Sequence, residues 1–315
     1  MEGFKSIINT KDVKNTVIQE GLAHLKLLLA QEWKPLFTSN GLAATTTYTP
    51  PGIQHGVPIT KGEMLVPTSM HPFSILSLFN CSDASHLYDS RTESSQRLEV
   101  VDGAVVAHSF QKRVWPASER EIILASSQVM WDDDLRCYLV VRRSTTHEKV
   151  PENSEGRVTA FLHVLSLMVT ETEDSGVFKV THVVHVDPKG SLPSAIVAIV
   201  ARANPMVPKN MIDFINKNGA PTLLPGGNML SVDVSYYSKD YRITTQFTED
   251  FESELIVDPL YYNTGVLAKV SEHAAVTRTK RGFSISAAGP NQVSLHITPL
   301  TGGNVGDITV NGDAI

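Results

Sequence analysis

The stretch VFKVTHVVHVDPKGSLPSAIVAIVARANPMVPKNMIDFINKNG, residues 177–219, joins a strand pattern to a helix pattern. Its first part alternates between two faces, as a β-strand does. The face predicted to be buried carries Phe178, Val180, His182, Val184 and Val186. The stretch therefore begins with a strand that turns one apolar face, with a single histidine, toward the interior.

The second part of this stretch predicts a long helix. It is apolar nearly all round in its first half, so it must be covered on most sides or cover something apolar itself. Pro193 suits the first turn and Gly219 the end of the helix. Pro205 and Pro208 lie between them and must kink or split it.

The segment before this strand has the two-residue period of an antiparallel sheet. Between residues 94 and 187, about six apolar runs are separated by tight turns. Asp102-Gly103, between two of these runs, is typical of a two-residue hairpin turn. The run RVTAFLHVLSLMV at 157–169 is apolar on both faces, so another element must cover the outside of the sheet. Its faces carry Phe161, Leu165 and Leu167 on one side and Leu162, Val164 and Met168 on the other.

Two helices are predicted toward the N-terminus. Apolar residues spaced by three and four predict an amphipathic helix over 11–34, which Pro35 ends. Short strands and turns fill 35–69, and HPFSILSLFN at 71–80 reads as a short helix with Pro72 in its first turn. We expect the outside of the sheet to be covered either by the first of these helices or by the C-terminal part of the chain.

The composition divides the chain into three parts. Residues 1–219 hold the helices and the sheet, APTLLPGG at 220–227 is a linker by composition, and 228–315 contains only the short strand-like runs of a small β-sandwich. An antiparallel sheet followed by one long apolar helix is the plan of an α+β helix-grip fold. In that fold the sheet curls round the helix and encloses an apolar cavity. We expect the two folded parts to pack together.

Composition and motifs exclude several classes of function. A net charge of −6 argues against a nucleic-acid partner, because basic surfaces hold such partners through counterion release. No run approaches the length of a membrane-spanning helix, and the N-terminal residues lack the apolar core of a signal peptide. The two cysteines are expected as free thiols in a reducing cytosol. Because phosphate-loop, dinucleotide, hydrolase and zinc motifs are missing, we expect no cofactor, no metal and no catalytic residues.

Four stretches, in the same order, resemble those of the START domains, the steroidogenic acute regulatory related lipid-transfer family. They are SHLYDSR at 85–91, RVWPASEREIIL at 113–124, GRVTA at 156–160 and VTHVVHVDPKGSLPSAIV at 180–197. The resemblance covers residues 11–219 and leaves the C-terminal part unexplained. Within the family, the run KRVWPAS at 112–118 is most similar to that of the ceramide carriers. The resemblance implies a helix-grip fold with a lipid in its cavity.

The resemblance also implies which residues contact the ligand. The polar groups that hold ceramide in its carriers fall here at Leu98, Glu119, Val140 and His182. Ser126 stands where sterol and phosphatidylcholine carriers place a cavity arginine, six residues after the motif arginine, Arg120. The apolar lining is expected from Phe161, Phe178, Val180, Val184, Ile196 and Val200.

Glu119 and His182 favour a small polar head on that lipid. Glu119 can accept a hydrogen bond and His182 can donate or accept one, which suits a hydroxyl or an amide. A carboxylate beside a phosphate would repel it. We therefore expect a sterol or a ceramide-like lipid. The alternative is that Glu119 is an exposed strand start paired with Arg120 or Lys112.

A lipid must enter and leave this cavity, which requires an element to move. The helix is weakest at its proline pair, so we expect the half that follows to open at a membrane. The apolar residues for that membrane gate are Met206, Val207, Met211 and Phe214. The alternative is that these side chains simply pack on the sheet. Trp115 is expected as a packing anchor, with an exposed Trp115 that faces a membrane as the alternative.

The sequence therefore predicts a non-enzymatic carrier that binds a lipid and transfers it between membranes. We expect a cytoplasmic, peripheral membrane protein in transient contact with membrane surfaces. Two alternatives stay open. One is a lipid-sensing adaptor whose C-terminal part, 228–315, binds a protein partner. The other is an enzyme acting on an apolar substrate in a helix-grip cavity, for which His182 with Glu119 is the available acid–base pair.

Overall fold

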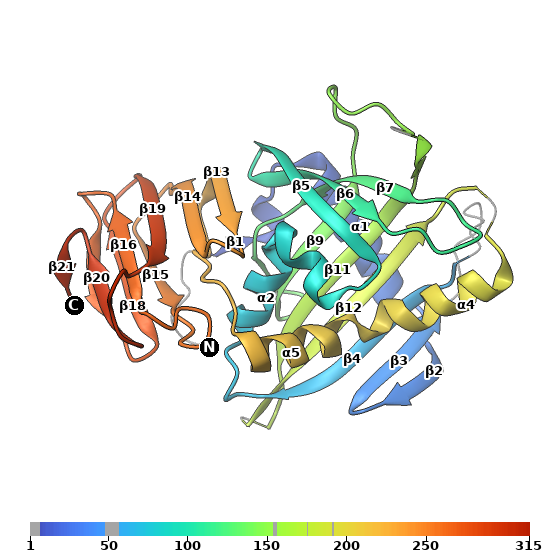
Figure 1. Ribbon diagram of the computed structural model, residues 1–315, viewed down its shortest axis with the longest axis horizontal. Helices are drawn as coiled ribbons and strands as arrows, with labels where there is room; N and C mark the ends of the chain where they lie inside the picture. Colours follow the sequence, from blue (N-terminus) through green and yellow to red (C-terminus); the bar gives the residue numbers. More distant parts are fainter. Residues whose placement is uncertain (1–6, 48–56, 154–155, 175, 191) are drawn as a thin grey trace.

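The computed structural model describes residues 7–47, 57–153, 156–174, 176–190 and 192–315. Within this part of the chain, a sheet with helices on both faces is followed by a smaller body built from strands (Figure 1). The helices α4 (Ser194–Ala203) and α5 (Val207–Asn218), yellow in Figure 1, cross one face of the sheet. The C-terminal strands, orange to red, lie at the other end of the molecule from α4. The predicted α+β helix-grip fold followed by an all-β body is confirmed.

The first sheet is antiparallel along its main path. Its order is β2 (Lys34–Ser39), β3 (Leu42–Thr47), β4 (Ile59–Pro67), β12 (Val177–Asp187), β11 (Phe161–Glu171), β9 (Cys137–Ser144), β7 (Arg120–Ser126), β6 (Ala104–Gln111) and β5 (Thr92–Val101). Short strands attached to it are β1 (Ile8–Asn9), β8 (Met130–Asp132) and β10 (Val158–Thr159). Asp102 and Gly103 join β5 to β6 with φ of 48° and 77°, as a two-residue hairpin turn requires.

Further helical elements lie before β5 and between α4 and α5. They are η1 (Thr10–Asp12), α1 (Thr16–Leu29), α2 (Pro72–Asn80), η2 (Ser82–Ala84), α3 (Ser85–Tyr88) and η4 (Asn204–Met206). α2 matches its prediction, with Pro72 in the first turn. The His71 ring caps this helix by accepting a hydrogen bond from the Phe73 backbone N–H at 3.2 Å.

The first helix begins later than the predicted range 11–34. α1 starts at Thr16, because the Asn15 side chain accepts a hydrogen bond from the Ile18 backbone N–H at 3.1 Å and caps the first turn. The residues before this cap form the separate 3₁₀ turn η1. The spacing of apolar residues does not predict this boundary, because a capping side chain defines it.

The first helix also ends earlier than predicted. α1 stops at Leu29, and the Trp33 indole donates a hydrogen bond to the Leu28 carbonyl at 3.2 Å where the chain turns away. Pro35, the predicted stop, lies inside the edge strand β2. An edge strand tolerates proline, because one side of its backbone needs no partner.

α1 is the cover on the outside of the sheet. Its apolar side packs on β9, β11 and β12. The cluster includes Ile18, Leu22, Leu25 and Leu28 on the helix and Val141, Val164, Met168 and Val183 on the strands. Gly21 allows this approach, because a Cβ there would lie 2.8 Å from Val141 Cγ1. The second face of β12, including Val183 and His185, is therefore buried as well, whereas the sequence predicted a single buried face.

A β-bulge in β11 exchanges two residues between the faces of the sheet. The pairing of β11 with β12 shifts register between Leu162 and Val164. Leu162 consequently lies on the inner face. Phe161 lies outside, with its ring centroid 4.8 Å from that of His163 and 5.7 Å from the Arg143 guanidinium carbon. The predicted faces of Phe161 and Leu162 are wrong, because a bulge breaks strict alternation.

The long C-terminal helix is split at its proline pair, as predicted. α4 and α5 are separated by the 3₁₀ turn η4, which contains Pro205. This turn is seated on β4, where a Cβ on Gly62 would lie 2.1 Å from the Pro205 carbonyl oxygen. Glycine is the residue that leaves room for the backbone here. The kink is therefore fixed against the sheet rather than free.

The C-terminal body is a sandwich of two sheets around its own core. One sheet has the order β13 (Asn228–Ser235), β14 (Asp240–Gln246), β19 (Gln292–Pro299), β16 (Val266–Val270), β20 (Ile308–Val310) and β21 (Asp313–Ala314). The other has the order β15 (Phe251–Ile256), β18 (Gly282–Ala287) and β17 (Ala275–Arg278). Fully buried Phe283, Ile285, Val293 and Ile297 lie in the core between them.

The run at 220–227 is buried against this sandwich. The Thr222 hydroxyl donates to the Ile256 carbonyl at 2.7 Å, and the Leu224 backbone N–H donates to the Tyr241 hydroxyl at 2.9 Å. A segment that is a linker by composition is thus fixed in place by hydrogen bonds. The domain boundaries 1–219 and 228–315 stay a prediction.

Candidate functional site

A cavity of about 250 Å³ lies between the inner face of the sheet and the C-terminal helices. Its wall is apolar over most of its length, because the alternating strands turn aliphatic side chains inward. These side chains include Val105, Ile122, Leu124, Leu162, Leu165, Val184 and Val186. α4 adds Ile196 and Val200, so this helix forms one wall of the cavity.

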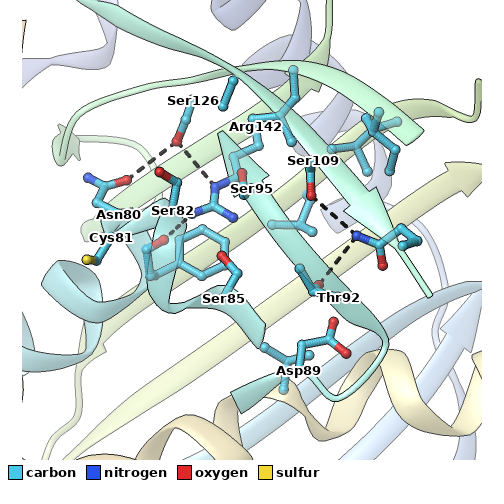
Figure 2. A pocket seen from close by; sticks show the side chains of 18 of the residues that line it. Asn80, Cys81, Ser82, Ser85, Asp89, Thr92, Ser95, Ser109, Ser126 and Arg142 are labelled. Carbon is cyan, nitrogen blue, oxygen red and sulfur yellow. Dashed lines mark hydrogen bonds between the residues drawn. The ribbon is translucent and has the colours of Figure 1, made fainter. Parts of the chain in front are cut away.

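One region of the cavity is polar, and Arg142 of β9 points into it (Figure 2). The Arg142 Nε donates a hydrogen bond to Ser126 Oγ at 3.3 Å, and its Nη2 donates to the Phe79 carbonyl. The guanidinium carbon lies 4.0 Å from the centroid of the Phe79 ring. Arg142 is thus held between β7 and the end of α2, with hydroxyl and amide groups such as Ser82 and Asn80 around it (Figure 2).

The described groups that hold Arg142 are all neutral. Burial lowers the pKa of the guanidinium, and the Tyr88 hydroxyl is the main group that opposes this change. The Arg142 side chain is partly accessible and lines the cavity. A buried charge is unfavourable without a compensating partner. The arrangement is therefore suited to a ligand that presents an oxygen acceptor to Arg142.

A second polar group joins the cavity wall to the kink of the helix. Arg91 makes two hydrogen bonds to the Asp89 carboxylate, at 2.9 and 2.8 Å, and a third to the side-chain oxygen of Asn204 in η4. All three residues line the cavity. The amide nitrogen of Asn204 is buried and has no hydrogen-bond partner among the described residues, so it is a donor available to a ligand.

His182 of β12 is the other polar side chain with unused hydrogen-bonding capacity. It lies on the cavity wall, and neither ring nitrogen makes a hydrogen bond of good geometry within the described part of the chain, although the Asn204 backbone lies close enough to oppose the fall of its pKa. Burial, reinforced by the positive charge of Arg91, lowers the pKa of His182 to about 3. The ring is therefore neutral near pH 7 and can donate one hydrogen bond and accept another.

The predicted site residues divide into two groups. Those on the cavity wall are Ser126, His182, Val184, Ile196 and Val200, with Val207 from the predicted gate. Those that do not line it are Leu98, Glu119, Val140, Phe161, Phe178 and Val180, with Met206, Met211 and Phe214 from the gate. Ligand contact by the first group stays a prediction.

The residues off the wall have definite places elsewhere. Val140, Phe178 and Val180 lie in a core in which α2 and α5 pack on the sheet, so α2 fills that end of the fold. Leu98 falls at a register shift between β5 and β6, and Arg97 takes the cavity-facing place beside it. Sequence alternation finds the inner face but cannot tell which part of it a neighbouring helix occupies.

Glu119 lies outside the cavity, at the start of β7. Its carboxylate pairs with Arg157 Nε at 3.4 Å, with 43% of the side chain exposed. Glu119 is therefore an exposed residue at the start of a strand, as the alternative prediction stated. Its ion-pair partner is Arg157 instead of the predicted Arg120 or Lys112. The Glu119–His182 acid–base pair is not assembled. The argument that Glu119 repels a phosphate fails for the same reason.

The predicted gate is mostly packed. Val207 and Met211 are buried in the core that includes α2. The Phe214 ring centroid lies 5.6 Å from that of Tyr236, in the C-terminal body. The alternative, in which these side chains pack inside the molecule, therefore describes this state of the protein. α4 is the less covered half of the helix, with Ile199 53% exposed.

Arg142, Arg91 and Asn204 were not predicted from the sequence. A signal for Arg142 does exist in the run CYLVVRRST, 137–145. Two successive arginines on a strand point to opposite faces, so one of them must point inward. Arg143 is the outer one, with Nη2 3.1 Å from the Glu20 carboxylate on α1.

One end of the cavity, which we call its mouth, lies by the turn between β6 and β7. Lys112, Val114 and Ser118 of this turn line the cavity, and Trp115 projects from it with 79% of its surface exposed. The Trp115-Pro116 peptide bond is cis. The expectation that Trp115 is a packing anchor is wrong, and the alternative of an exposed tryptophan holds.

Two negative findings apply to the described residues. No helix there has the length and apolar character needed to cross a bilayer. In the same residues, no cluster of three or more His, Cys, Asp or Glu side chains could hold a metal ion. Cys81 and Cys137 are both free and buried.

Comparison with known sequences places the first part of the chain in a family. The START domain matches residues 30–220. The ceramide transfer protein of Cricetulus griseus is 24% identical over 162 residues, which are 46% of this chain and 27% of that protein. The ceramide transfer protein of Homo sapiens is 25% identical over 154 residues, 44% of this chain and 24% of that protein. The chain thus spans about a quarter of the length of the curated relatives it matches.

Comparison with solved structures gives the same fold. Human StAR-related lipid transfer protein 5 aligns with a TM-score of 0.52 and 15% identity, over 63% of this chain and 98% of that one. The helix-grip architecture, the cavity between sheet and helix, and the match over residues 30–220 agree. The chain therefore belongs to the START family of lipid-binding and lipid-transfer domains.

Proposed function

We propose that this protein binds one lipid molecule in its cavity and carries it between membranes without chemical change. The observation that carries the proposal is the cavity itself, which is apolar along the sheet and polar around Arg142 and His182. Hydrocarbon removed from water contributes roughly 25 cal/mol per Å² of buried surface. A polar head left unpaired in the same cavity would cost roughly 1–3 kcal/mol, so the polar groups define where the head lies.

The unused hydrogen-bonding groups favour a small head with an amide or hydroxyl. Arg142 already donates to Phe79 and Ser126, which leaves it suited to one further oxygen rather than to cradling a phosphate. Asn204 offers a second donor, and the neutral His182 ring offers an acceptor for an O–H or N–H. A ceramide-like lipid carries both kinds of group, and a sterol hydroxyl is the simpler case. Ceramide is also the cargo in the name of the relatives.

The C-terminal helix is proposed as the gate, with α4 as the moving half. α4 lines the cavity through Ile196 and Val200 and exposes its other side. η4 is seated on Gly62, and the apolar side of α5 is buried in the core with α2, so both are poor candidates for motion. Displacement of α4 about η4 would open the cavity without disturbing the core.

Membrane contact is proposed at the mouth. The exposed Trp115 projects from the turn that contributes Lys112 to the cavity wall. An amphipathic tryptophan next to a basic residue suits the interface of a bilayer. We place this contact on the cytoplasmic side, since two buried free cysteines are typical of a reducing compartment.

A transfer assay tests the function. Donor vesicles of phosphatidylcholine would carry a labelled ceramide or a labelled cholesterol, and the label reaching acceptor vesicles would be measured over time. We expect the protein to accelerate transfer of the ceramide. Trp115→Ala should slow transfer from vesicles yet leave binding of ceramide delivered in detergent unchanged. Leu260→Ala, at another exposed apolar residue, is the matched control.

Two results would contradict the proposal. Absence of both transfer and binding for ceramide and cholesterol would rule out the small-head carrier. A phospholipid as the dominant species that copurifies with the protein, identified by mass spectrometry, would keep the carrier function but exclude the small head.

A further inference from the structure

The C-terminal sandwich is docked on the START part at the edge strand β5. The Arg97 guanidinium donates to the Val232 carbonyl at 2.9 Å and to the Val234 carbonyl at 3.3 Å. The Tyr236 backbone N–H donates to the Asp83 carboxylate at 2.9 Å. β5 and β13 are each an edge strand of their sheet, and Arg97 bridges them.

The cavity continues into this junction. Beyond Ser126, its wall passes through Gln128, whose side chain donates to the Gly227 carbonyl at 2.6 Å, and reaches the sandwich. The apolar side chains contributed there include Leu224, Met229, Val232, Val234, Tyr241 and Ile243, which we call the junction wall. The START part alone would leave the cavity open at this point.

The junction wall is apolar, in contrast to the region around Arg142. Leu224, Met229, Tyr241 and Ile243 are each less than 10% exposed. The Tyr241 hydroxyl accepts a hydrogen bond from the Leu224 backbone N–H, so this residue presents its ring rather than an unpaired polar atom. The carbonyls beside Val232 are occupied by Arg97. The polar side chains that line the cavity beside this wall, Arg97 and Gln128, already donate to the backbone carbonyls of Val232, Val234 and Gly227. The junction wall therefore favours hydrocarbon, which would bury its surface there, over a polar head.

We propose that the junction wall is a hydrocarbon-chain subsite, so that the C-terminal sandwich forms part of the lipid-binding site. The proposal rests on the lipid-carrier function proposed above. The polar linkage of the lipid lies by Arg142 and His182, one chain runs along the sheet toward the mouth, and the other chain lies against the junction wall. A lipid with two hydrocarbon limbs on either side of a polar linkage fits this arrangement.

Two tryptophan variants on one strand test the subsite. Val232→Trp fills the junction from β13, and Leu230→Trp places the same side chain on the same strand at a residue that is 45% exposed and off the wall. Each full-length protein would be incubated with vesicles of a total brain lipid extract, recovered, and its bound lipids identified by mass spectrometry. Binding of N-hexanoyl and N-stearoyl ceramide would then be compared.

The expected result is selective. Val232→Trp should lower occupancy by long two-chain lipids about tenfold and shift the bound species toward shorter or single chains, because the removed space held several methylene groups. Leu230→Trp should match the wild type. Met229→Phe adds less volume to the same wall and should shift the bound lipids more weakly toward shorter or single chains. It replaces Val232→Trp as the test if that variant does not fold.

The outcomes separate this inference from the function on which it rests. If the wild type recovers no lipid at all, the carrier function fails. If the wild type binds lipid and Val232→Trp, folded, binds the same species to the same extent, the carrier function stands and the junction subsite is refuted. Unchanged lipids in Met229→Phe, with Val232→Trp unfolded, refute it equally.

Discussion

Arg142 and Arg143 are neighbours in the chain with opposite surroundings. Arg142 faces the cavity among neutral groups, and Arg143 faces α1, where it pairs with Glu20. Successive side chains on a strand point to opposite faces, so the two arginines differ mainly in the face of the sheet on which they lie. A variant of Arg143 is therefore a matched control for the same variant of Arg142.

Arg142→Leu should weaken binding of ceramide about ten- to a hundredfold, since a hydrogen bond from a charged donor contributes roughly 1.5–3 kcal/mol. The folded protein without lipid should be no less stable, because the variant removes a buried charge held by neutral groups alone. Ceramide binding measured by fluorescence and unfolding measured in urea check the two statements. Arg143→Leu should leave binding unchanged, and equal losses in both variants would show that Arg142 has no special role.

His182 predicts a dependence of stability on pH. Its pKa is about 3 in the folded protein because of burial, against about 6.5 in an unfolded chain. Between these values the unfolded chain binds a proton that the folded chain does not, so stability falls as the pH is lowered from about 6.5. For this one group the loss at about pH 5 is about 2 kcal/mol.

Urea unfolding at about pH 7.5 and about pH 5 measures this loss. His182→Gln should remove most of the contribution of this residue to the difference, whereas His273→Gln, at an exposed position, should not. His71 is half-buried and its pKa is lowered to about 4, so it should contribute part of the pH dependence of stability in both variants. A pH dependence that is identical in wild type and His182→Gln would contradict the assignment.

At the scale of elements, the sequence predicts the order and type of helices and strands better than their contacts. The proline pair predicts the split between α4 and α5, and Asp102-Gly103 predicts the hairpin, because each feature is local. The bulge at Leu162 and the filling of one end of the fold by α2 depend on partners distant in sequence. For that reason Val180 was expected in the cavity and lies in a core, while Arg142 was not expected there.

The proposal that α4 moves can be tested by tethering it. Arg202 on α4 lies over Phe37 of β2, with its guanidinium carbon 5.9 Å from the ring centroid. Cysteines at these two positions, joined by a short cross-linker that reduction can cleave, should slow ceramide transfer about tenfold or more, because the mouth cannot open.

Reduction should restore the rate in the tethered protein. The native Cys81 and Cys137 are buried and should not react. A cross-link placed within the sandwich, between cysteines at Thr244 and Ser294 on adjacent strands, is the control and should leave transfer unchanged. Full transfer by the tethered protein would mean that another element opens the cavity.

At the scale of the molecule, the two parts share more than a chain connection. Val100 and Val105 of the β5–β6 hairpin pack against the core of the sandwich. The junction adds the Arg97 hydrogen bonds described above. We therefore expect the two parts to unfold together, as a single cooperative unit.

Arg97→Ala should uncouple them, since it removes three junction hydrogen bonds, including one to the Asp233 carboxylate at 3.2 Å. All three tryptophans lie before residue 132, so their fluorescence reports the START part, and hydrogen exchange reports the sandwich. In the wild type the two probes should report one unfolding transition. In the variant the transitions of the two parts should separate, with a loss of about 1–3 kcal/mol in the free energy of unfolding of the less stable part.

Arg278→Ala is the control. It removes a hydrogen bond to Gly306 within the sandwich and should leave a single transition. Separate unfolding transitions in the wild type would show that the two parts are only weakly coupled. That result would contradict a cavity wall shared between them.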